Sequence, residues 1–411
     1  MSSTVDVKLI NTDDNEKYEY PTRSLEIRVS SSKQIITPTR AATDYEFNQK
    51  AQIPTDITVD NPIYTSVTDL NCAEFKNLMY VNGHYDKIIS NMEKKSGLSI
   101  YSNLRLFLLM PTVSDQKDEK SGKILNEAPM AQLKSNTRLL DSFIRTNIRL
   151  QRDIGLKLIT IPFIELPFSQ YKDIIRGIYQ VLDKSGEQPV FFIDMRYKDF
   201  KKTIDLLAND YQTNMIGVYH RKYRHANINY DYLTDEYSRK DIAFLAASVE
   251  RSSLQDISTM HYLPFMGNDV YAIKRKRGFP KYAKDENGDY TRDAKGKLVV
   301  EASTYTTDNI KFFNRDNLRI ENINTDTQTV QRFLTEYDGD YFITSLLKNY
   351  RNIEGKKEDV EALRAFSRVS ELKSSQTEFT SFQKLINENS TSDYIDEKTV
   401  LKQVLNGKEN L

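Results

Sequence analysis

Charged side chains directly follow two apolar, strand-like runs of this sequence, and these charges could carry chemistry. Asp194 and Arg196 come after the run PVFFI, and Glu165 comes after LITIPFI. A carboxylate beside an apolar strand is costly unless it is paired, and in a dry cleft it can act as a nucleophile or a general base. We predict Asp194 as the nucleophile or base and Glu165 as its acid/base partner. The alternative is that these charges only form the polar ends that strands need where they leave the core.

The ends of neighbouring strand-like runs carry further charges that could hold a substrate. The predicted substrate-binding residues are Arg196, His220, Arg221, Lys222, Glu250 and Arg251. The stretch 218–230, VYHRKYRHANINY, interleaves basic and aromatic side chains, which can contact phosphates and stack on bases. The run 274–282, KRKRGFPKY, has the same character. Both stretches predict local nucleic-acid contacts, unless they are only solvated loop surfaces.

The sequence offers little for a metal or a cofactor. His220 and His225 lie five residues apart, but no HExxH motif or cysteine accompanies them, so we predict no metal site. Cys72 is the single cysteine, which excludes an internal disulfide and a cysteine-based zinc cluster. We find no GxxxxGK[ST] loop, no GxSxG elbow, no kinase motif set and no GxGxxG after a first strand. We therefore predict no cofactor.

The overall composition limits the possible partners. The 58 basic and 58 acidic side chains cancel, so any binding to nucleic acid must be local. Nothing approaches 18 consecutive apolar residues, and the first 20 residues lack the basic and apolar regions of a signal peptide. Together with the single cysteine, this pattern predicts a soluble, cytoplasmic protein without a membrane partner. The sequence leaves the oligomeric state open.

The elements that would position these charges alternate between apolar strands and amphipathic helices from residue 104 to about residue 275. Strands that are apolar throughout belong to parallel sheets that are covered on both faces. Five such units favour a TIM-like (β/α) barrel over a doubly wound sheet, and strands near Ile36 and Ile57 and at 310–313 would complete eight. In a barrel the carboxyl ends of the strands share one mouth, where the predicted site would lie.

The domain organisation follows from changes in composition. Residues 1–24 are polar and aperiodic, which predicts a flexible N-terminal arm. Residues 25–320 form the predicted barrel-like domain, with a charged hairpin inserted at about 274–308. Residues 321–411 contain several amphipathic stretches, which predict a helical C-terminal region.

The segment LEIRVSSSKQIITPTRAAT, with Ile35, Thr37 and Pro38 at the matching positions, resembles the start of the barrel in tRNA-guanine transglycosylases and their deazaguanine-inserting DNA relatives. The resemblance implies a TIM barrel that exchanges a nucleobase, with an Asp nucleophile attacking the ribose or deoxyribose carbon. It also implies nucleic acid held by basic patches around the mouth. The DSGGFQ motif and the zinc-binding cysteines of that family are absent, so no catalytic residue is carried over to this chain.

These observations lead to one functional expectation and two alternatives. We expect a divergent transglycosylase-like enzyme, a glycosyltransferase that exchanges or modifies a nucleobase in DNA or RNA. The first alternative is a non-catalytic barrel scaffold that binds nucleic acid or a protein partner through its aromatic and basic rim. The second, a small-molecule barrel enzyme such as an aldolase or lyase, lacks an evident lysine or metal set at the strand ends.

Overall fold

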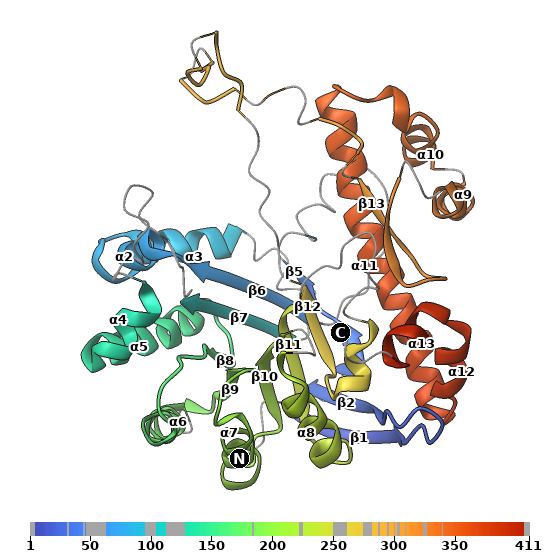
Figure 1. Cartoon of the computed structure of the whole chain (residues 1–411). Coiled ribbons are helices and arrows are strands. Elements are labelled where there is room, and N and C mark those ends of the chain that lie inside the picture. Colours follow the sequence, from blue (N-terminus) through green and yellow to red (C-terminus); the bar gives the residue numbers. More distant parts are fainter. Residues whose placement is uncertain are drawn as a thin grey trace.

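The computed structural model has a large α/β body and a smaller part above it, which are joined by one long helix (Figure 1). The described residues are 5–30, 33–43, 46, 63–94, 104–111, 128–182, 185–221, 225–249, 261–273, 282–286, 288–293, 296–299, 301, 305–308, 310–323, 327–338 and 340–406. No helix within these ranges is long and apolar enough to cross a membrane.

A six-stranded parallel sheet forms the centre of the body, in the order β4-β12-β11-β10-β9-β8. Its strands are β4 (Thr39–Arg40), β8 (Leu158–Ile161), β9 (Gln188–Asp194), β10 (Met215–Tyr219), β11 (Ala243–Val249) and β12 (Val270–Ile273). Their residues are almost all buried, because helices or other strands cover both faces. The predicted α/β class with parallel strands is confirmed.

A second parallel sheet, in the order β5-β6-β7, adjoins the first. It consists of β5 (Ala42–Thr43), β6 (Ile63–Leu70) and β7 (Leu104–Pro111). Only Ala41 separates β5 from β4, and its backbone N–H donates to the Tyr271 carbonyl of β12 at 2.8 Å. At the other edge, β7 packs beside β8. The two sheets therefore adjoin at both of their edges.

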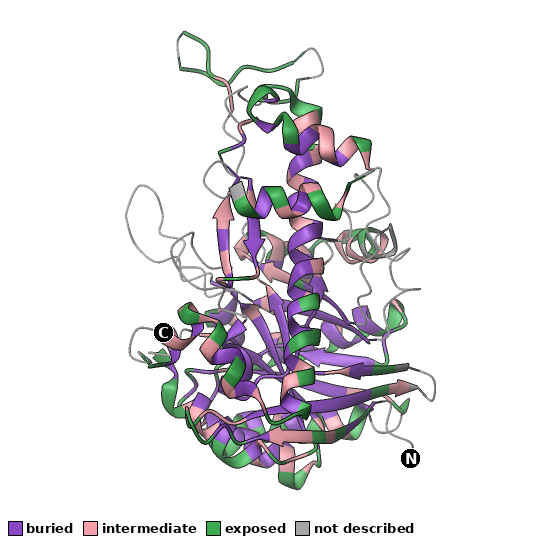
Figure 2. Cartoon of the chain, turned by 90° about the vertical axis from the view of Figure 1, so that its right-hand side faces the viewer, coloured by how far each residue is buried: buried purple, intermediate pink, exposed green. Residues whose placement is uncertain are grey.

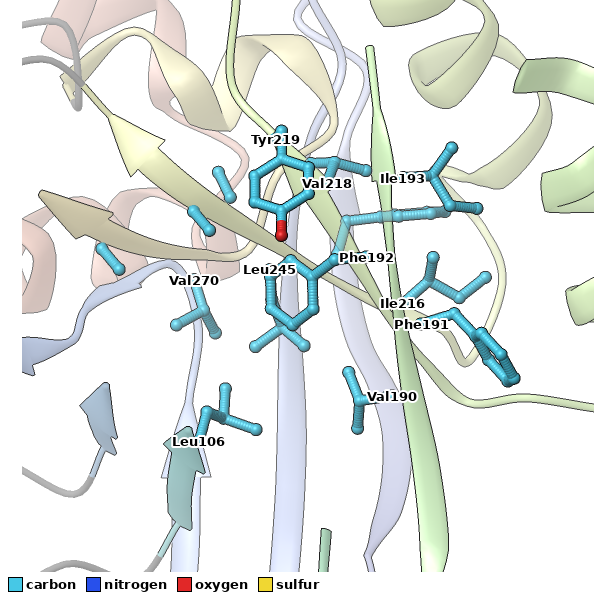
Figure 3. Packing of buried hydrophobic residues seen from close by; sticks show 14 of the residues in the cluster. Leu106, Val190, Phe191, Phe192, Ile193, Ile216, Val218, Tyr219, Leu245 and Val270 are labelled. Atoms are coloured by element: carbon cyan, nitrogen blue, oxygen red, sulfur yellow. The ribbon is translucent and has the colours of Figure 1, made fainter. Parts of the chain in front are cut away.

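Apolar side chains from both sheets meet in a common core (Figure 3). Leu106 of β7, Phe192 of β9, Leu245 of β11 and Val270 of β12 line a cavity of about 10 Å³, which is about one water-sized probe. The interior is therefore filled by side chains and is not a pore. Gly217 of β10 leaves the space for Phe192, because a Cβ at residue 217 would lie 2.4 Å from the Phe192 ring.

Helices connect the consecutive strands from β6 to β11. They are α2 (Cys72–Tyr80), α3 (His84–Lys94), α4 (Pro129–Ser135), α5 (Thr137–Asp153), α6 (Phe168–Leu182), α7 (Phe200–Asp205) with its extension η3 (Leu206–Asp210), and α8 (Asn227–Tyr237). The sequence predicts α5 and α6 because their buried residues recur every three or four positions, as do Tyr171, Ile175 and Ile178. The sequence does not predict helix α8, because this segment is polar along most of its length. The helix nevertheless buries Tyr230 and Leu233.

An antiparallel sheet begins the described chain, in the order β1-β2-β3. Its strands are β1 (Asp6–Asp13), β2 (Thr22–Ser30) and β3 (Lys33–Ile36). Residues 6–13, which we expected in a flexible arm, form a paired strand instead. The reason is a short period-two pattern among charged residues, in which Val5 and Val7 are buried and Leu9 packs against the core. The strand ending at Ile36 belongs to this sheet and not to a parallel one, and the expected strand near Ile57 lies outside the described residues.

The C-terminal part is mainly helical, as the sequence predicts, but it contains a hairpin of its own. Its elements are β13 (Lys311–Asn314), β14 (Arg319–Asn322), α9 (Thr327–Glu336), α10 (Tyr341–Lys348), η8 (Tyr350–Asn352), α11 (Lys357–Asn387), α12 (Thr391–Glu397) and α13 (Thr399–Asn406). The run 310–313, expected to add a parallel strand, instead pairs antiparallel with β14.

Two hydrophobic cores divide the C-terminal elements between them. Side chains from Ile310 to Val369 form a second core around β13, α9, α10 and the first half of α11. Phe379 and Phe382, farther along α11, belong to the main core together with side chains of α12 and α13. The helix α11 therefore runs from one core into the other (Figure 2). The charged insertion projects beyond both cores as a small hairpin, with bridges between Lys284 and Tyr290 and between Arg292 and Leu298 (Figure 1).

Candidate functional site

A cleft of about 490 Å³ opens at the carboxyl ends of the parallel strands. Its polar wall comes from consecutive strand ends and includes Asp69, Glu165, Asp194, Arg196, Arg221 and Ser248. The sequence predicts four of these residues as site residues, on the argument that strand ends share one mouth. The fold brings those four, Glu165, Asp194, Arg196 and Arg221, into the same cleft.

Asp194 ends β9 and is held by the two arginines of the cleft. The Arg221 guanidinium donates to both carboxylate oxygens, from Nε to Oδ1 at 3.3 Å and from an Nη to Oδ2 at 2.6 Å. The backbone N–H of Arg196 also donates to Oδ1 at 2.8 Å, and the Arg196 Nε lies 3.6 Å from it. The Asp194 side chain is 14% exposed, so it is reachable from the cleft and fixed in orientation.

Helix α8 fixes the strand end that carries Arg221. The Tyr230 hydroxyl donates to the Arg221 carbonyl at 2.8 Å and accepts from its backbone N–H at 3.2 Å. The same hydroxyl lies 2.7 Å from Nδ1 of His220. Asn229 adds a bond from its side-chain amide to the Met195 carbonyl at 2.7 Å, which ties α8 to the loop after β9. The sequence gives no sign of this support, because Tyr230 lies in a stretch without helical periodicity.

His220 has a different position from the one we predicted. It is 4% exposed, and among the described residues it is not part of the cleft wall. Burial lowers the pKa of its imidazole to about 3, with a smaller contribution from the nearby Arg221 charge. His220 is therefore neutral at physiological pH and supports the strand end through Tyr230.

Glu165 faces the same cleft from a more exposed position. Its side chain is 61% exposed and forms an ion pair with Lys134 of α4. Glu165 is therefore less enclosed than Asp194, whose side chain is 14% exposed.

Two polar residues of the cleft were not predicted from the sequence. Asp69 is the second-last residue of β6, whose sequence IYTSVTDL mixes apolar and polar residues. Its β-branched residues were the available signal for a strand. Ser248 lies near the end of β11 with a φ of 59°, beside a register shift in the pairing with β12. A left-handed conformation at a non-glycine residue is costly, and such residues cluster at functional sites.

The chemistry of this cleft has to be inferred from its own side chains. No protein-family model matches the sequence, and no curated protein matches it. Within the ranges that the structure describes, no group of three or more His, Cys, Asp or Glu side chains could hold a metal ion. The predicted residues Lys222, Glu250 and Arg251 lie outside those ranges, as does the run 274–281.

Proposed function

We propose that this chain is a (β/α)-barrel enzyme that exchanges or modifies a nucleobase in DNA or RNA, with Asp194 as its reacting carboxylate. The observation that carries the proposal is the position of Asp194 at the carboxyl end of β9, inside a cleft and between two guanidinium groups. A fixed carboxylate can attack a sugar carbon, and guanidinium groups are suited to hold phosphate.

The barrel is supported by the way the two sheets adjoin. The segments β4 and β5 act as one strand that bonds to β12 on one side and to β6 on the other. Strands β6 to β12 then follow in chain order, and β7 lies beside β8. Eight parallel strands in this order, with a core filled by side chains from both sheets, fit a TIM-like barrel.

The proposed reaction has two displacement steps at the anomeric carbon. An Asp194 oxygen forms a bond to the sugar C1′, the C1′–N bond breaks, and the bond electrons leave with the base. An incoming free base then attacks C1′ and releases the Asp194 carboxylate. Glu165 is the proposed proton donor and acceptor for the two bases, while Arg196 and Arg221 meet the phosphates next to the reacting nucleotide.

A substitution of the reacting carboxylate tests this proposal. Asp194→Asn keeps the shape of the side chain and removes its charge, so base exchange should fall at least about 100-fold while oligonucleotide binding remains. The assay incubates DNA and RNA oligonucleotides with a panel of free purine and deazapurine bases and follows the oligonucleotide mass. Asp173→Asn, at an exposed position of α6, is the matched control. Exchange by the Asp194→Asn variant at the parental rate would refute the role of Asp194.

A second function is favoured by one feature of the same site. Both oxygens of Asp194 already accept bonds from Arg221, and Oδ1 also accepts from the Arg196 backbone N–H. Glu165 is paired with Lys134. In this alternative the barrel is a non-catalytic scaffold, and the rim binds nucleic acid or a protein partner. The parental protein would then bind oligonucleotides without changing their mass, whichever free base from the panel is present.

A further inference from the structure

A basic groove lies beside the cleft, between the loop after β9 and the start of α8. Its volume is about 430 Å³. The charged and titratable residues in its wall are Arg196, Lys198, Asp199, Lys201, Lys202 and His225. Among the described residues of the wall, Lys and Arg contribute four side chains, and Asp199 contributes the one carboxylate.

The lysines of this basic groove are available to a ligand. Lys198, Lys201 and Lys202 are all exposed, and Lys202 is 69% exposed even though it lies 3.3 Å from the Asp199 carboxylate. The Lys201 ammonium lies 4.8 Å from the centre of the Tyr232 ring, which positions it without neutralising it. Asp199 can offset only one of these charges, so the groove keeps a positive field that attracts anions.

The basic groove adjoins the cleft that holds Asp194. Arg196 and Tyr197 belong to the walls of both. Tyr197 is a rigid partition, because its hydroxyl donates to the Leu166 carbonyl at 2.7 Å and its ring packs edge-on against Phe163. On the far side, α8 lines the groove with its first turn, where the helix dipole adds a partial positive charge.

The groove presents many charges and little stacking surface. Among its described lining residues, Tyr197 is 3% exposed, and the His225 imidazole is the one exposed ring. Bases bind to single-strand proteins largely by stacking on aromatic rings, whereas phosphates bind to cations. The groove is thus better suited to a chain of phosphates than to bases.

We propose that the basic groove binds the phosphodiester backbone of a single nucleic-acid strand next to the nucleotide whose base enters the cleft. This inference rests on the proposed function and names how its polymeric substrate is held. Three lysines contact successive phosphates, and Arg196 contacts the phosphate at the boundary with the cleft. We expect binding at the groove to depend little on base sequence, because contacts to phosphates carry no sequence information.

The test removes the three lysine charges and keeps their stems. The variant combines Lys198→Gln, Lys201→Gln and Lys202→Gln. Its matched control combines Lys348→Gln, Lys356→Gln and Lys384→Gln, which lie at exposed positions on or beside α10 and α11. Fluorescence anisotropy measures the binding of 15-nucleotide single-stranded DNA, of RNA of the same sequence, and of a poly-glutamate peptide, each over a range of salt concentrations.

The expected result is a loss of oligonucleotide affinity in the groove variant but not in the control variant. Affinity for the oligonucleotides at low salt falls about 10- to 100-fold, and the slope of log K against log salt becomes shallower by about 2. The control variant binds like the parent, and the DNA and RNA arms identify which polymer the groove prefers. Unchanged oligonucleotide binding by the groove variant overturns the proposal, as does tighter groove-dependent binding of poly-glutamate than of either oligonucleotide.

Failure of this inference is distinguishable from failure of the proposed function. If the groove lysines control oligonucleotide binding but the parental protein never exchanges a base, the assignment of the groove is supported and the enzymatic proposal fails. If the groove variant exchanges bases with an unchanged KM for the oligonucleotide, the enzymatic proposal stands and the groove assignment fails.

Discussion

Single residues in this protein are constrained by close packing as well as by charge. Gly217 shows this most directly, because the ring of Phe192 occupies the space that a side chain at residue 217 would need. The two residues face each other across the parallel pair of β10 and β9. A glycine inside a strand usually weakens it, so its presence indicates a close approach by a neighbour.

Gly217→Ala should therefore destabilise the protein by about 1–3 kcal/mol, because the added methyl group overpacks the core. Urea unfolding followed by circular dichroism measures the change. Gly177→Ala in α6 is the matched control, since a Cβ there meets nothing within 4 Å. It should be neutral or stabilise by up to about 1 kcal/mol. Equal effects of the two substitutions would contradict the packing argument.

At the residue scale, the orientation of the charged side chains in the cleft also depends on ion pairs that the sequence does not reveal. Asp194 and Arg221 are 27 residues apart and meet because β9 and β10 are neighbours. The prediction that both residues line the same cleft required only that each follows an apolar, strand-like run in the sequence. Their direct pairing depends on strand register and on how the side chains pack.

At the scale of elements, α8 holds the two strand ends that carry Arg221 and Asp194 in place through hydrogen bonds. The Tyr230 hydroxyl bonds to the backbone of Arg221 and to His220, and burial raises the pKa of this phenol well above its ordinary value. The hydroxyl therefore stays protonated and can keep donating. A helix that holds the last residues of a strand in this way limits how far Arg221 can move.

Tyr230→Phe should lower the free energy of unfolding by about 1–3 kcal/mol, since it leaves buried polar groups without their partner. Thermal and urea unfolding give the change. Tyr341→Phe removes a hydroxyl from a side chain that is 87% exposed, so it should change stability by no more than about 0.5 kcal/mol. If both variants unfold like the parent, the hydroxyl of Tyr230 does not brace the strand end.

At the scale of the whole molecule, α11 runs from the second hydrophobic core into the main core, where a buried histidine stacks on it. His261 stacks between Phe313 of β13 and Phe379 of α11, with ring centroids 4.7 and 4.9 Å away. Burial lowers its pKa to about 3, and the charges of Arg40, Lys398 and Arg315 contribute in the same direction. The three rings come from segments that are far apart in the sequence, so the stack forms only in the assembled fold.

This arrangement predicts a loss of stability in acid. The unfolded chain binds a proton at His261 near pH 6.5, whereas the folded chain binds it only near pH 3. Between these values the unfolded state binds more protons, so acidification favours unfolding. From pH 6 to 5, each such histidine lowers the free energy of unfolding by about 1.4 kcal/mol per pH unit at most, and His220 adds a second contribution of the same sign.

His261→Phe keeps an aromatic ring in the stack and removes the titration. Urea unfolding at a series of pH values should give a slope that is smaller than that of the parent by about 1 kcal/mol per unit. An unchanged slope would mean that His261 is not protonated on unfolding, or that it is already charged in the folded protein.

The sequence by itself determined the parallel α/β body and the strand-end charges of β8, β9 and β10, because long apolar runs and helical periodicity are local signals. It missed β1, β6 and α8, whose patterns are short or mixed with polar residues. The tertiary structure alone decided that Arg221 pairs with Asp194 and that Lys134 pairs with Glu165. It also decided that His220 is buried against Tyr230 and does not line the cleft. These outcomes depend on strand register and helix placement, which bring together side chains that are far apart in the sequence.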